Sequence, residues 1–327
     1  MSSAAEPSSS DVETRGAAGP LRIDPLTPVI GAVVSGVDLR QPFSPPVKAR
    51  IDQALLDWKL LVFRGQDLTD QDQIAFSRQF GPLAPAHPIS AGLPEHPEVW
   101  ERHAKDYTPR YRPDRSAASL EAPRDYRGWH TDITFVANPN SYTILRGTNV
   151  PAYGGDTLWA NLEAAYDGLS PAIQALIQNL KGVHRSSAYD FQGASPHGLR
   201  NPTGYAAVHP LVRVHPITRR KALFVSPGAP RYIVGLHQRE SEALLGLLRE
   251  EVIRPEYAVR VHHEPGSIAI WDNRNTVHAG PIDFAHFTDS RVVHRTIVVG
   301  DLPQGPDGFR SRALEGELFG ALDDQAA

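Results

Sequence analysis

The stretch GWHTDITF, residues 128–135, carries a histidine and an aspartate two positions apart. In a β-strand, residues i and i+2 point to the same side, so a strand here would present the imidazole of His130 and the carboxylate of Asp132 on one face. Such a pair supplies two of the three ligands of a 2-His-1-carboxylate site, which suits Fe(II) and leaves coordination positions open. The stretch therefore predicts a metal site that needs one more histidine from elsewhere in the fold.

Two other segments have a histidine two residues before a glutamate. His96–Pro97–Glu98 contains a proline, which cannot donate to a strand ladder, so a paired strand is disfavoured there. His262–His263–Glu264 ends at a Pro–Gly turn, and we interpret it as a pair of histidines exposed at a strand edge. Residues 130–132 are therefore favoured over both as part of a metal site.

The third ligand has several candidates among the fourteen histidines of the chain. His278 is favoured by its context, because it follows the apolar run SIAIW (267–271) and the polar residues DNRNT and then meets Ala279–Gly280. A histidine at the mouth of a barrel strand can face ligands on a partner strand. On the sequence alone, His209 and His294 stay open as alternatives.

The pattern after this stretch is mostly β. Six short apolar runs are separated by Pro/Gly turns: YTILR (142–146), DTLWA (156–160), KALFV (221–225), YAVRVH (257–262), SIAIW (267–271) and RTIVVG (295–300). Further strands are expected at 21–27, 31–39 and 59–63. Because the strands do not alternate regularly with helices, the pattern favours a barrel or sandwich with flanking helices over an open parallel sheet.

Four segments are predicted to be helices, at about 45–58, 69–80, 171–180 and 239–252. The first has Ser44 as its expected N-cap and prolines in its first turn. In the second, Thr69 and Asp72 resemble a capping box. The third has Ser170 as its cap and Gly182 as its expected stop.

The chain is expected to form one domain over residues 21–327, preceded by a tail of residues 1–20 that is rich in Ser, Ala and Pro and reads as disordered. Residues 101–127 are polar, charged and proline-bearing, without a clear period. A loop of this length in a compact domain is often an active-site lid, and a simple insertion is the alternative.

Composition excludes several classes of site. The chain has no cysteine, which excludes disulfides, thiol nucleophiles and cysteine-held metals. Its formal net charge of -4 gives no global field that would attract nucleic acid or anionic lipid. No apolar run is long enough for a membrane span, and the N-terminus lacks the apolar core of a secretory signal. The expected location is the cytoplasm, without nucleic-acid or membrane partners.

Two arginines close to the last apolar run predict an anion site. Arg291 and Arg295 lie four residues apart in SRVVHRTIVV and would share a face of a strand. The planar guanidinium pairs with carboxylates in bidentate fashion. An arginine that borders a buried run needs a counter-ion, and a bound anion is one. The alternative is a pair of solvated arginines on an exposed strand.

Five motifs in the same order as these candidates resemble the taurine dioxygenase family. They are WHTD (129–132), GGDTLWAN (154–161), WDNR (271–274), His278 and RVVHR (291–295). The resemblance runs from about residue 21 to residue 303, which is nearly the whole chain. It implies a double-stranded β-helix (jelly roll) with flanking helices, and an enzyme that uses Fe(II), 2-oxoglutarate and O₂.

The resemblance also implies a role for particular residues. His130, Asp132 and His278 would be the iron ligands. Thr157 and Arg291 would bind the distal carboxylate of 2-oxoglutarate, with Trp271 as a wall of that pocket. Arg295, His87 and the backbone of Ile133 would contact the sulfate or sulfonate group of a small organic anion. The family further implies a homodimer or homotetramer.

The sequence departs from the family where the amine of taurine would be held. Ser90 and Tyr126 stand where a tyrosine and an asparagine are expected. These differences, and the turn-rich GDLPQGPDGFRSR (300–312), favour the alkylsulfatase branch and an anion without an amine. The predicted reaction hydroxylates the carbon next to the sulfate or sulfonate group, releasing sulfate or sulfite and an aldehyde, with succinate and CO₂.

Other functions remain to be distinguished from this one. The same enzyme class could act on taurine, an aryloxyalkanoate or another carboxylate, or could carry out a desaturation. A jelly-roll binding module would hold metal and ligand without turnover, and a zinc hydrolase could use the same three ligands without O₂. Halogenation is disfavoured because Asp132 would occupy the position of the halide.

Overall fold

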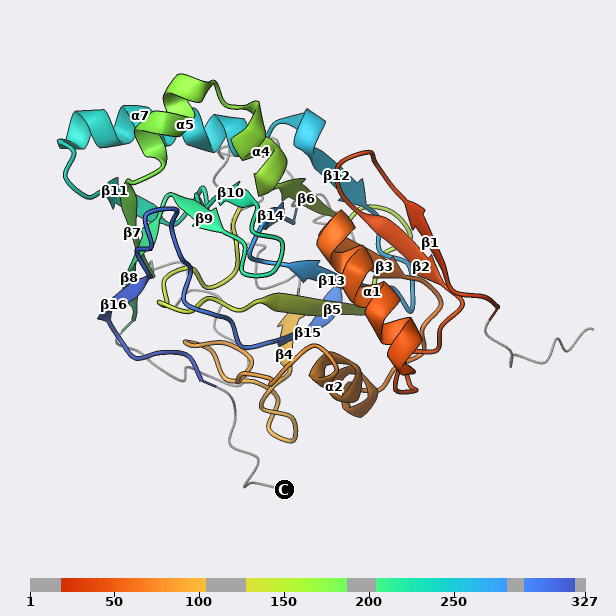
Figure 1. The fold of residues 1–327 in the computed structure, drawn as a ribbon. Helices are drawn as coiled ribbons and strands as arrows, with labels where there is room; N and C mark the ends of the chain where they lie inside the picture. Colours follow the sequence, from red (N-terminus) through yellow and green to blue (C-terminus); the bar gives the residue numbers. More distant parts are fainter. Residues whose placement is uncertain (1–18, 104–127, 187–203, 281–290, 321–327) are drawn as a thin grey trace, which may run out of the picture.

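The computed structural model describes residues 19–103, 128–186, 204–280 and 291–320 (Figure 1). The expected N-terminal tail up to residue 18, most of the expected lid and Tyr126 lie outside the described residues. Glu101–His103, predicted to open the lid loop, instead belong to a strand, β4 (Trp100–His103), because they pair with the strand that carries Arg295. The described chain is mainly β with flanking helices, as predicted.

The largest sheet joins strands that are far apart in the sequence. Its order is β1 (Arg22–Pro25), β2 (Ala32–Ser35), β3 (Leu60–Phe63), β13 (Ile268–Asp272), β5 (Tyr142–Asn149), β15 (Val292–Ile297) and β4. All its pairs are antiparallel except β2–β3. The early β3 thus pairs with the late β13, and β5 lies between β13 and β15, which is the winding of a double-stranded β-helix.

The other sheets complete the jelly roll. They are β12 (Ala258–Val261), β6 (Thr157–Asn161) and β14 (Thr276–Ala279); β11 (Pro230–Ile233), β7 (Lys181–Arg185), β8 (Ala206–Pro210) and β16 (Arg312–Glu315); and β10 (Lys221–Leu223) with β9 (Val212–Val214). Trp159 on β6 meets Trp271 on β13 edge to face, with 5.5 Å between ring centroids. Both rings are buried, so this contact packs the small sheet against the large one and contributes strongly to the core.

The helices lie outside the sheets (Figure 1). They are α1 (Pro45–Trp58), α2 (Asp70–Arg78), α4 (Leu162–Gly168), α5 (Pro171–Ile177) and α7 (Gln238–Val252), followed by the 3₁₀ turn η3 (Pro255–Tyr257). Figure 1 shows α4, α5 and α7 grouped on one side of the molecule, with α1 and α2 along the large sheet. None of the described helices has the length and apolar character needed to cross a bilayer.

The helix boundaries follow their caps. At α2 the capping box is confirmed, since Thr69 Oγ1 accepts from Asp72 N and an Asp72 carboxylate oxygen accepts from Thr69 N. The Ser170 cap of α5 is also confirmed, but the helix ends at Ile177, and Gly182, its expected stop, lies in β7. Ser44 precedes α1 without a side-chain capping bond, because prolines at the first positions leave fewer N–H donors to cap.

One of the described α-helices, α4, was not predicted. The short α4 begins at Leu162, and the side-chain oxygen of its N-cap residue Asn161 accepts from the backbone N–H groups of Glu163 and Ala164. Asparagine is a strong N-cap, so the signal was present in the sequence. It was hidden because Asn161 also ends the strand β6.

Candidate metal centre and its surroundings

His130, Asp132 and His278 converge in the structure, as predicted. Their ligand atoms all lie within 4.8 Å of one another, and no other group of three such side chains converges in this way within the described ranges. The Nε2 atoms of His130 and His278 each lie 3.9 Å from Oδ1 of Asp132. Two donors that share one ion at about 2.1 Å each can be at most about 4.2 Å apart, so these distances admit a single ion between them.

The backbone that carries the first two residues is not the predicted strand. His130 forms a single antiparallel bridge with His278, with reciprocal N–H···O bonds of 2.8 Å, but residues 132–135 form a turn. Within this turn Ile133 has φ of 42°, a left-handed conformation that is rare for a branched residue. The chain therefore bends immediately after the bridge, and this bend turns the Asp132 carboxylate toward the two histidines.

Buried hydrogen bonds hold the Asp132 carboxylate in place. Oδ2 accepts from the hydroxyl of Thr143 at 2.7 Å, and Oδ1 accepts from Nη1 of Arg295 at 2.6 Å. Burial alone would raise the pKa of Asp132, but the charge of Arg295, the neighbouring imidazoles and the Thr143 hydroxyl together lower it. Asp132 is therefore an anion at neutral pH, as a metal ligand must be.

The histidines also suit a metal. Burial, then His130 and Arg295, lowers the pKa of His278 to about 3, so its ring is neutral at neutral pH. Nδ1 of His130 lies 3.2 Å from the carbonyl of Gly128, which it meets as a donor and so leaves Nε2 free to ligate. Two imidazoles and one carboxylate match the donor set that binds Fe(II). The residues present therefore fit the metal that the sequence predicts.

Two neighbours of the metal centre were not identified from the sequence. Thr143 lies on β5, directly opposite Trp271 of β13, and its hydroxyl also accepts from the side-chain amides of Asn140 and Asn273 at 2.8 Å. Asn273, within the WDNR motif, accepts from the indole N–H of Trp271. The Trp271 ring lies 4.9 Å from the His278 ring, so it walls the metal centre itself.

Two of the expected co-substrate residues, Thr157 and Arg291, lie near the start of β6. Nε2 of His263 is 2.9 Å from Oγ1 of Thr157, and both side chains are buried. A Cβ atom at Gly155 would lie only 2.9 Å from Cδ of Arg291, so the Arg291 chain packs directly on this glycine. Thr157 and Arg291 therefore approach the same part of the fold. The expectation that His263 is exposed is wrong, because it lies inside this cluster.

Two of the predicted substrate residues, Arg295 and His87, meet at the ring of Trp100. The Arg295 guanidinium lies 4.3 Å from the ring centroid of Trp100, and the ring of His87 lies 4.5 Å from the same ring. Trp100 pairs directly with Arg295 across β4 and β15, which explains the stacking. Trp100 was not predicted, because only this pairing brings it to the site. Arg295 also has a counter-ion within the chain, Asp132, so it does not by itself require a bound anion.

His87 is fixed as a donor. Its Nδ1 accepts from the backbone N–H groups of Ile89 and Ser90 at 3.1 and 3.2 Å, so the proton of the neutral ring is on Nε2. Burial, then Arg295 and Arg102, lowers the pKa of His87 well below its usual value. The Ser90 hydroxyl beside it is buried and has no partner among the described residues.

The alternative histidines serve other purposes. His294 faces away from Arg295 and bonds Asp70 at 2.6 Å. Nε2 of His209 lies 2.7 Å from the carbonyl oxygen of Thr134, and Nδ1 lies 2.7 Å from the hydroxyl of Ser311. His209 therefore holds the 132–135 turn in place. His96 lies in a turn, as its proline neighbour predicted. The distal ligand position is thus left to His278.

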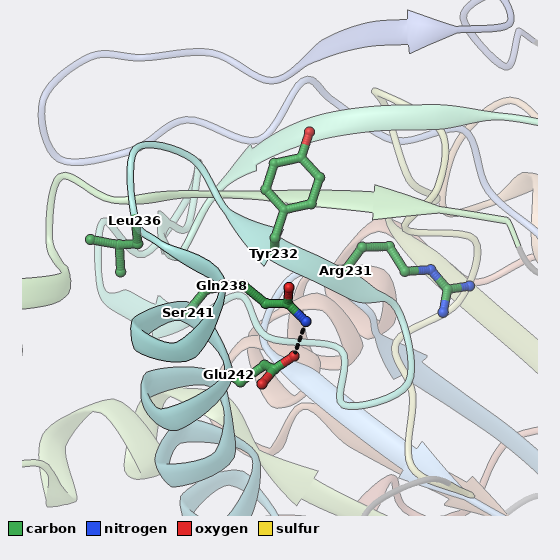
Figure 2. Close-up of a pocket in the computed structure, with 6 residues that line it drawn as sticks. All are labelled: Arg231, Tyr232, Leu236, Gln238, Ser241 and Glu242. Atoms are coloured by element: carbon green, nitrogen blue, oxygen red, sulfur yellow. Dashed lines mark hydrogen bonds between the residues drawn. The ribbon is translucent and has the colours of Figure 1, made fainter.

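A separate surface hollow lies between β11 and the start of α7 (Figure 2). It is lined by Arg231, Tyr232, Leu236, Gln238, Ser241 and Glu242. Figure 2 shows Gln238 bonded to Glu242 along the helix, at 2.8 Å. None of the metal-centre residues lines this hollow, so it is distinct from the site described above.

Comparison with known protein families gives one match over most of the chain. Residues 22–297 match the model described as "Taurine catabolism dioxygenase TauD, TfdA family". The chain belongs to this family. It is therefore a 2-oxoglutarate-dependent dioxygenase, an oxidoreductase whose class uses Fe(II) and O₂, and the group formed by His130, Asp132 and His278 has the donor set that could hold such a metal ion.

Individual proteins are also similar to this chain over nearly its whole length. The chain is 34% identical over 305 residues to an alkylsulfatase of Acinetobacter baylyi, covering 89% of each chain. It is 34% identical over 307 residues to an alpha-ketoglutarate-dependent sulfate ester dioxygenase of Pseudomonas putida, covering 89% of this chain and 94% of that one. A solved taurine dioxygenase structure from Burkholderia xenovorans is 42% identical, with a TM-score of 0.79, over 91% of this chain and 95% of that one. These similarities support the jelly-roll fold and the alkylsulfatase-like branch.

Proposed function

We propose that this enzyme oxidises a small organic sulfate or sulfonate at the carbon next to its anionic group. The observation that carries the proposal is the position of Arg295, which bonds the metal-ligand carboxylate and stacks on Trp100 beside His87. Two hydrogen-bond donors, the charged guanidinium of Arg295 and the neutral imidazole N–H of His87, thus lie beside the metal centre. The similarity to sulfate ester dioxygenases supports the same substrate class.

Each residue has one task in this proposal. His130, Asp132 and His278 would hold Fe(II), while Thr157 and Arg291 would bind the distal carboxylate of 2-oxoglutarate. When bound, Fe(II) with 2-oxoglutarate and O₂ supplies the oxidation of a C–H bond to C–OH, with succinate and CO₂ as the other products. Trp271, whose ring lies 4.9 Å from that of His278, and Trp159, which packs on Trp271, would exclude water from the inner side of the metal centre, because both rings are buried.

The anion site would set which carbon is oxidised. Arg295 donates N–H groups in a planar fork, and His87 donates from Nε2, so together they can hold two oxygens of one sulfate group. Fixing that group fixes the carbon attached to it, since the two are one or two bonds apart. Positioning of this kind is a large part of what a protein contributes to such a reaction.

The products follow from the chemistry of the hydroxylated carbon. In a sulfate ester, the new hydroxyl shares its carbon with the ester oxygen. The hydroxyl proton leaves, its oxygen becomes the aldehyde carbonyl, and the electron pair of the C–O bond departs with sulfate. In a sulfonate the C–S bond breaks in the same way, and its electron pair departs with sulfite.

The proposal excludes an amine from the preferred substrate. Ser90 lies beside His87 with a short side chain, where the family resemblance predicts a tyrosine for taurine. The single hydroxyl of Ser90 could instead meet a third oxygen of the anion. We further propose that the enzyme is cytoplasmic. We also propose that it is a homodimer or homotetramer, and size-exclusion chromatography would check this oligomeric state.

A substrate panel tests this function. Alkyl sulfates, alkylsulfonates, taurine and aryloxyalkanoates are compared by succinate formation under air with Fe(II) and 2-oxoglutarate. We expect the alkyl sulfates or alkylsulfonates to give the highest kcat/KM. Higher values for taurine or an aryloxyalkanoate would overturn the substrate assignment while leaving the enzyme class intact.

Replacement of Arg295 separates its role from that of Arg291. Arg295→Ala should weaken substrate binding by about 2–5 kcal/mol, as for truncation of a buried charge pair. Substrate-free turnover of 2-oxoglutarate should survive at saturating Fe(II), which offsets the loss of the Arg295 bond to Asp132. If Arg295→Ala instead abolished 2-oxoglutarate binding with iron still bound, the roles of the two arginines would have to be exchanged.

A further inference from the structure

His263 lies in the co-substrate cluster because of the register between β12 and β6. Val261 on β12 pairs directly with Thr157 on β6. The two strands are antiparallel. If the register is continued two residues beyond Val261, His263 lies across from Gly155, which is two residues before Thr157. The ring is 2% exposed, and its Nε2 lies 2.9 Å from the Thr157 hydroxyl.

Arg291, the residue immediately before β15, reaches the same cluster. It packs on Gly155, where a Cβ would lie 2.9 Å from its Cδ. Burial lowers the pKa of His263 to about 3, with Arg291 and Arg64 as the next causes. A neutral imidazole, a hydroxyl and a guanidinium thus converge on the place where the carboxylate of 2-oxoglutarate is expected.

The neutral ring has one N–H, and its position decides what the Thr157 hydroxyl can do. With the proton on Nε2, His263 donates to Oγ1, and the hydroxyl proton is free to donate to an anion. With the proton on Nδ1, the hydroxyl donates to Nε2 instead, and its lone pairs would face the anion. Nδ1 of His263 is buried without a hydrogen-bond partner among the described residues, so the second arrangement would also bury an unpaired N–H donor.

We infer that His263 is a positioning residue for 2-oxoglutarate: its Nε2–H donates to Thr157 and thereby directs the Thr157 hydroxyl proton to the distal carboxylate. The inference rests on the co-substrate part of the proposed function and is independent of the substrate that is oxidised. It predicts that His263 contributes to binding only when the ligand has a distal carboxylate.

Binding to the Mn(II)-loaded protein tests this inference without turnover. Calorimetry would compare N-oxalylglycine, a stable analogue of 2-oxoglutarate, with oxalate, which chelates the metal but has no distal carboxylate. His263→Leu and Thr157→Val should each weaken N-oxalylglycine binding about tenfold, the typical effect of losing an oriented hydrogen bond to a charged group. Oxalate should bind both variants as it binds the wild type.

The double variant shows whether His263 acts through Thr157. In the Thr157→Val background, His263→Leu should cause no further loss, because the hydroxyl that it orients is gone. His263→Gln, whose amide N–H can reach the position of Nε2, should recover most of the affinity. His262→Leu is the matched control, since this neighbouring ring is part-exposed and contacts Asp156 instead. It should bind like the wild type.

Three results would overturn the inference. One is wild-type affinity of His263→Leu for N-oxalylglycine, and another is additive losses in the double variant. The third is an Nδ1–H tautomer of His263 in ¹⁵N NMR spectra of the zinc-loaded wild type with N-oxalylglycine, a measurement that needs no variant to fold. Failure of the metal-loaded wild type to bind N-oxalylglycine at all would instead overturn the proposed co-substrate site together with this inference.

Discussion

Replacing Thr143 by valine should damage the metal centre from a strand that carries none of its ligands. Thr143 is fully buried, and its hydroxyl donates to Asp132 Oδ2 at 2.7 Å while accepting from the amides of Asn140 and Asn273. Valine has nearly the same shape, so the change removes one oxygen and its three hydrogen bonds without opening a cavity. The Asp132 carboxylate then keeps Arg295 as its one described side-chain donor.

The magnitude follows from these contacts. A hydrogen bond to a charged group is worth about 1.5–3 kcal/mol, and buried amide donors left without a partner add to the loss. We expect the free energy of unfolding to fall by about 2–4 kcal/mol. Because Asp132 is less firmly held, affinity for Fe(II) or Mn(II) should fall about 10- to 100-fold, the usual cost of removing a group that orients a metal ligand.

Calorimetric titration with Mn(II) and urea unfolding of the metal-free protein measure the two effects separately. Thr148→Val is the matched control on the same strand, where the hydroxyl is exposed and, among the described residues, bonds the carbonyl of Val292. It should change stability by about 0.5 kcal/mol or less. Wild-type metal affinity in Thr143→Val would refute the reasoning, because it would mean that the orientation of Asp132 does not depend on this hydroxyl.

Three further predictions concern buried groups. Gly155→Ala should weaken N-oxalylglycine binding and lower the free energy of unfolding by about 1–3 kcal/mol, because Gly155 has a φ of +67° and the new Cβ would meet Arg291. Wild-type affinity of this variant in a calorimetric titration would contradict the prediction. Burial lowers the pKa of His209 to about 3, so the folded protein keeps this ring neutral at a pH where the unfolded chain would protonate it. The protein therefore has its full stability above the unfolded pKa of about 6.5 and loses stability as the pH falls toward 3. Between pH 7.5 and pH 5 His209 alone should contribute about 2 kcal/mol to the loss of stability in urea unfolding, and His209→Gln should reduce the total loss by about that amount. Asp272→Asn breaks a buried pair with Arg274 and should cost about 3–5 kcal/mol, visible as a lower Tm, whereas an unchanged Tm would show the pair to be dispensable.

Local signals in the sequence predicted local features well. The Thr69–Asp72 capping box and the strands with clear apolar runs, such as β3, β5 and β13, were identified because capping and strand patterning act over a few neighbouring residues. Strands without such a run, such as β7, β8 and β11, were not predicted. The pair at 130 and 132 was also found, although for a partly wrong reason. A strand was expected to align the two side chains, whereas the structure uses a bridge followed by a turn with a left-handed Ile133. Such a conformation has no composition signal, because a branched residue rarely adopts it.

Contacts that depend on strand register could not be predicted. Trp100 meets Arg295 only because β4 and β15 pair, and His263 meets Thr157 only because β12 and β6 pair in one register. A slip of one residue would have turned His263 to the other face of the sheet, where it would be the exposed residue that its sequence context predicts. Composition and local periodicity contain no information about that choice.

The most direct test of the account is the stoichiometry and oxygen dependence of sulfate release. The wild-type protein with Fe(II), 2-oxoglutarate and a medium-chain alkyl sulfate should release sulfate and succinate in equal amounts under air. It should release neither without O₂, and His130→Ala should form no succinate in response to the substrate. Sulfate release that continues without O₂ would contradict the account, because the three ligands would then serve a hydrolase. Full activity of His130→Ala with iron stoichiometrically bound would equally contradict the assignment of His130 to the metal.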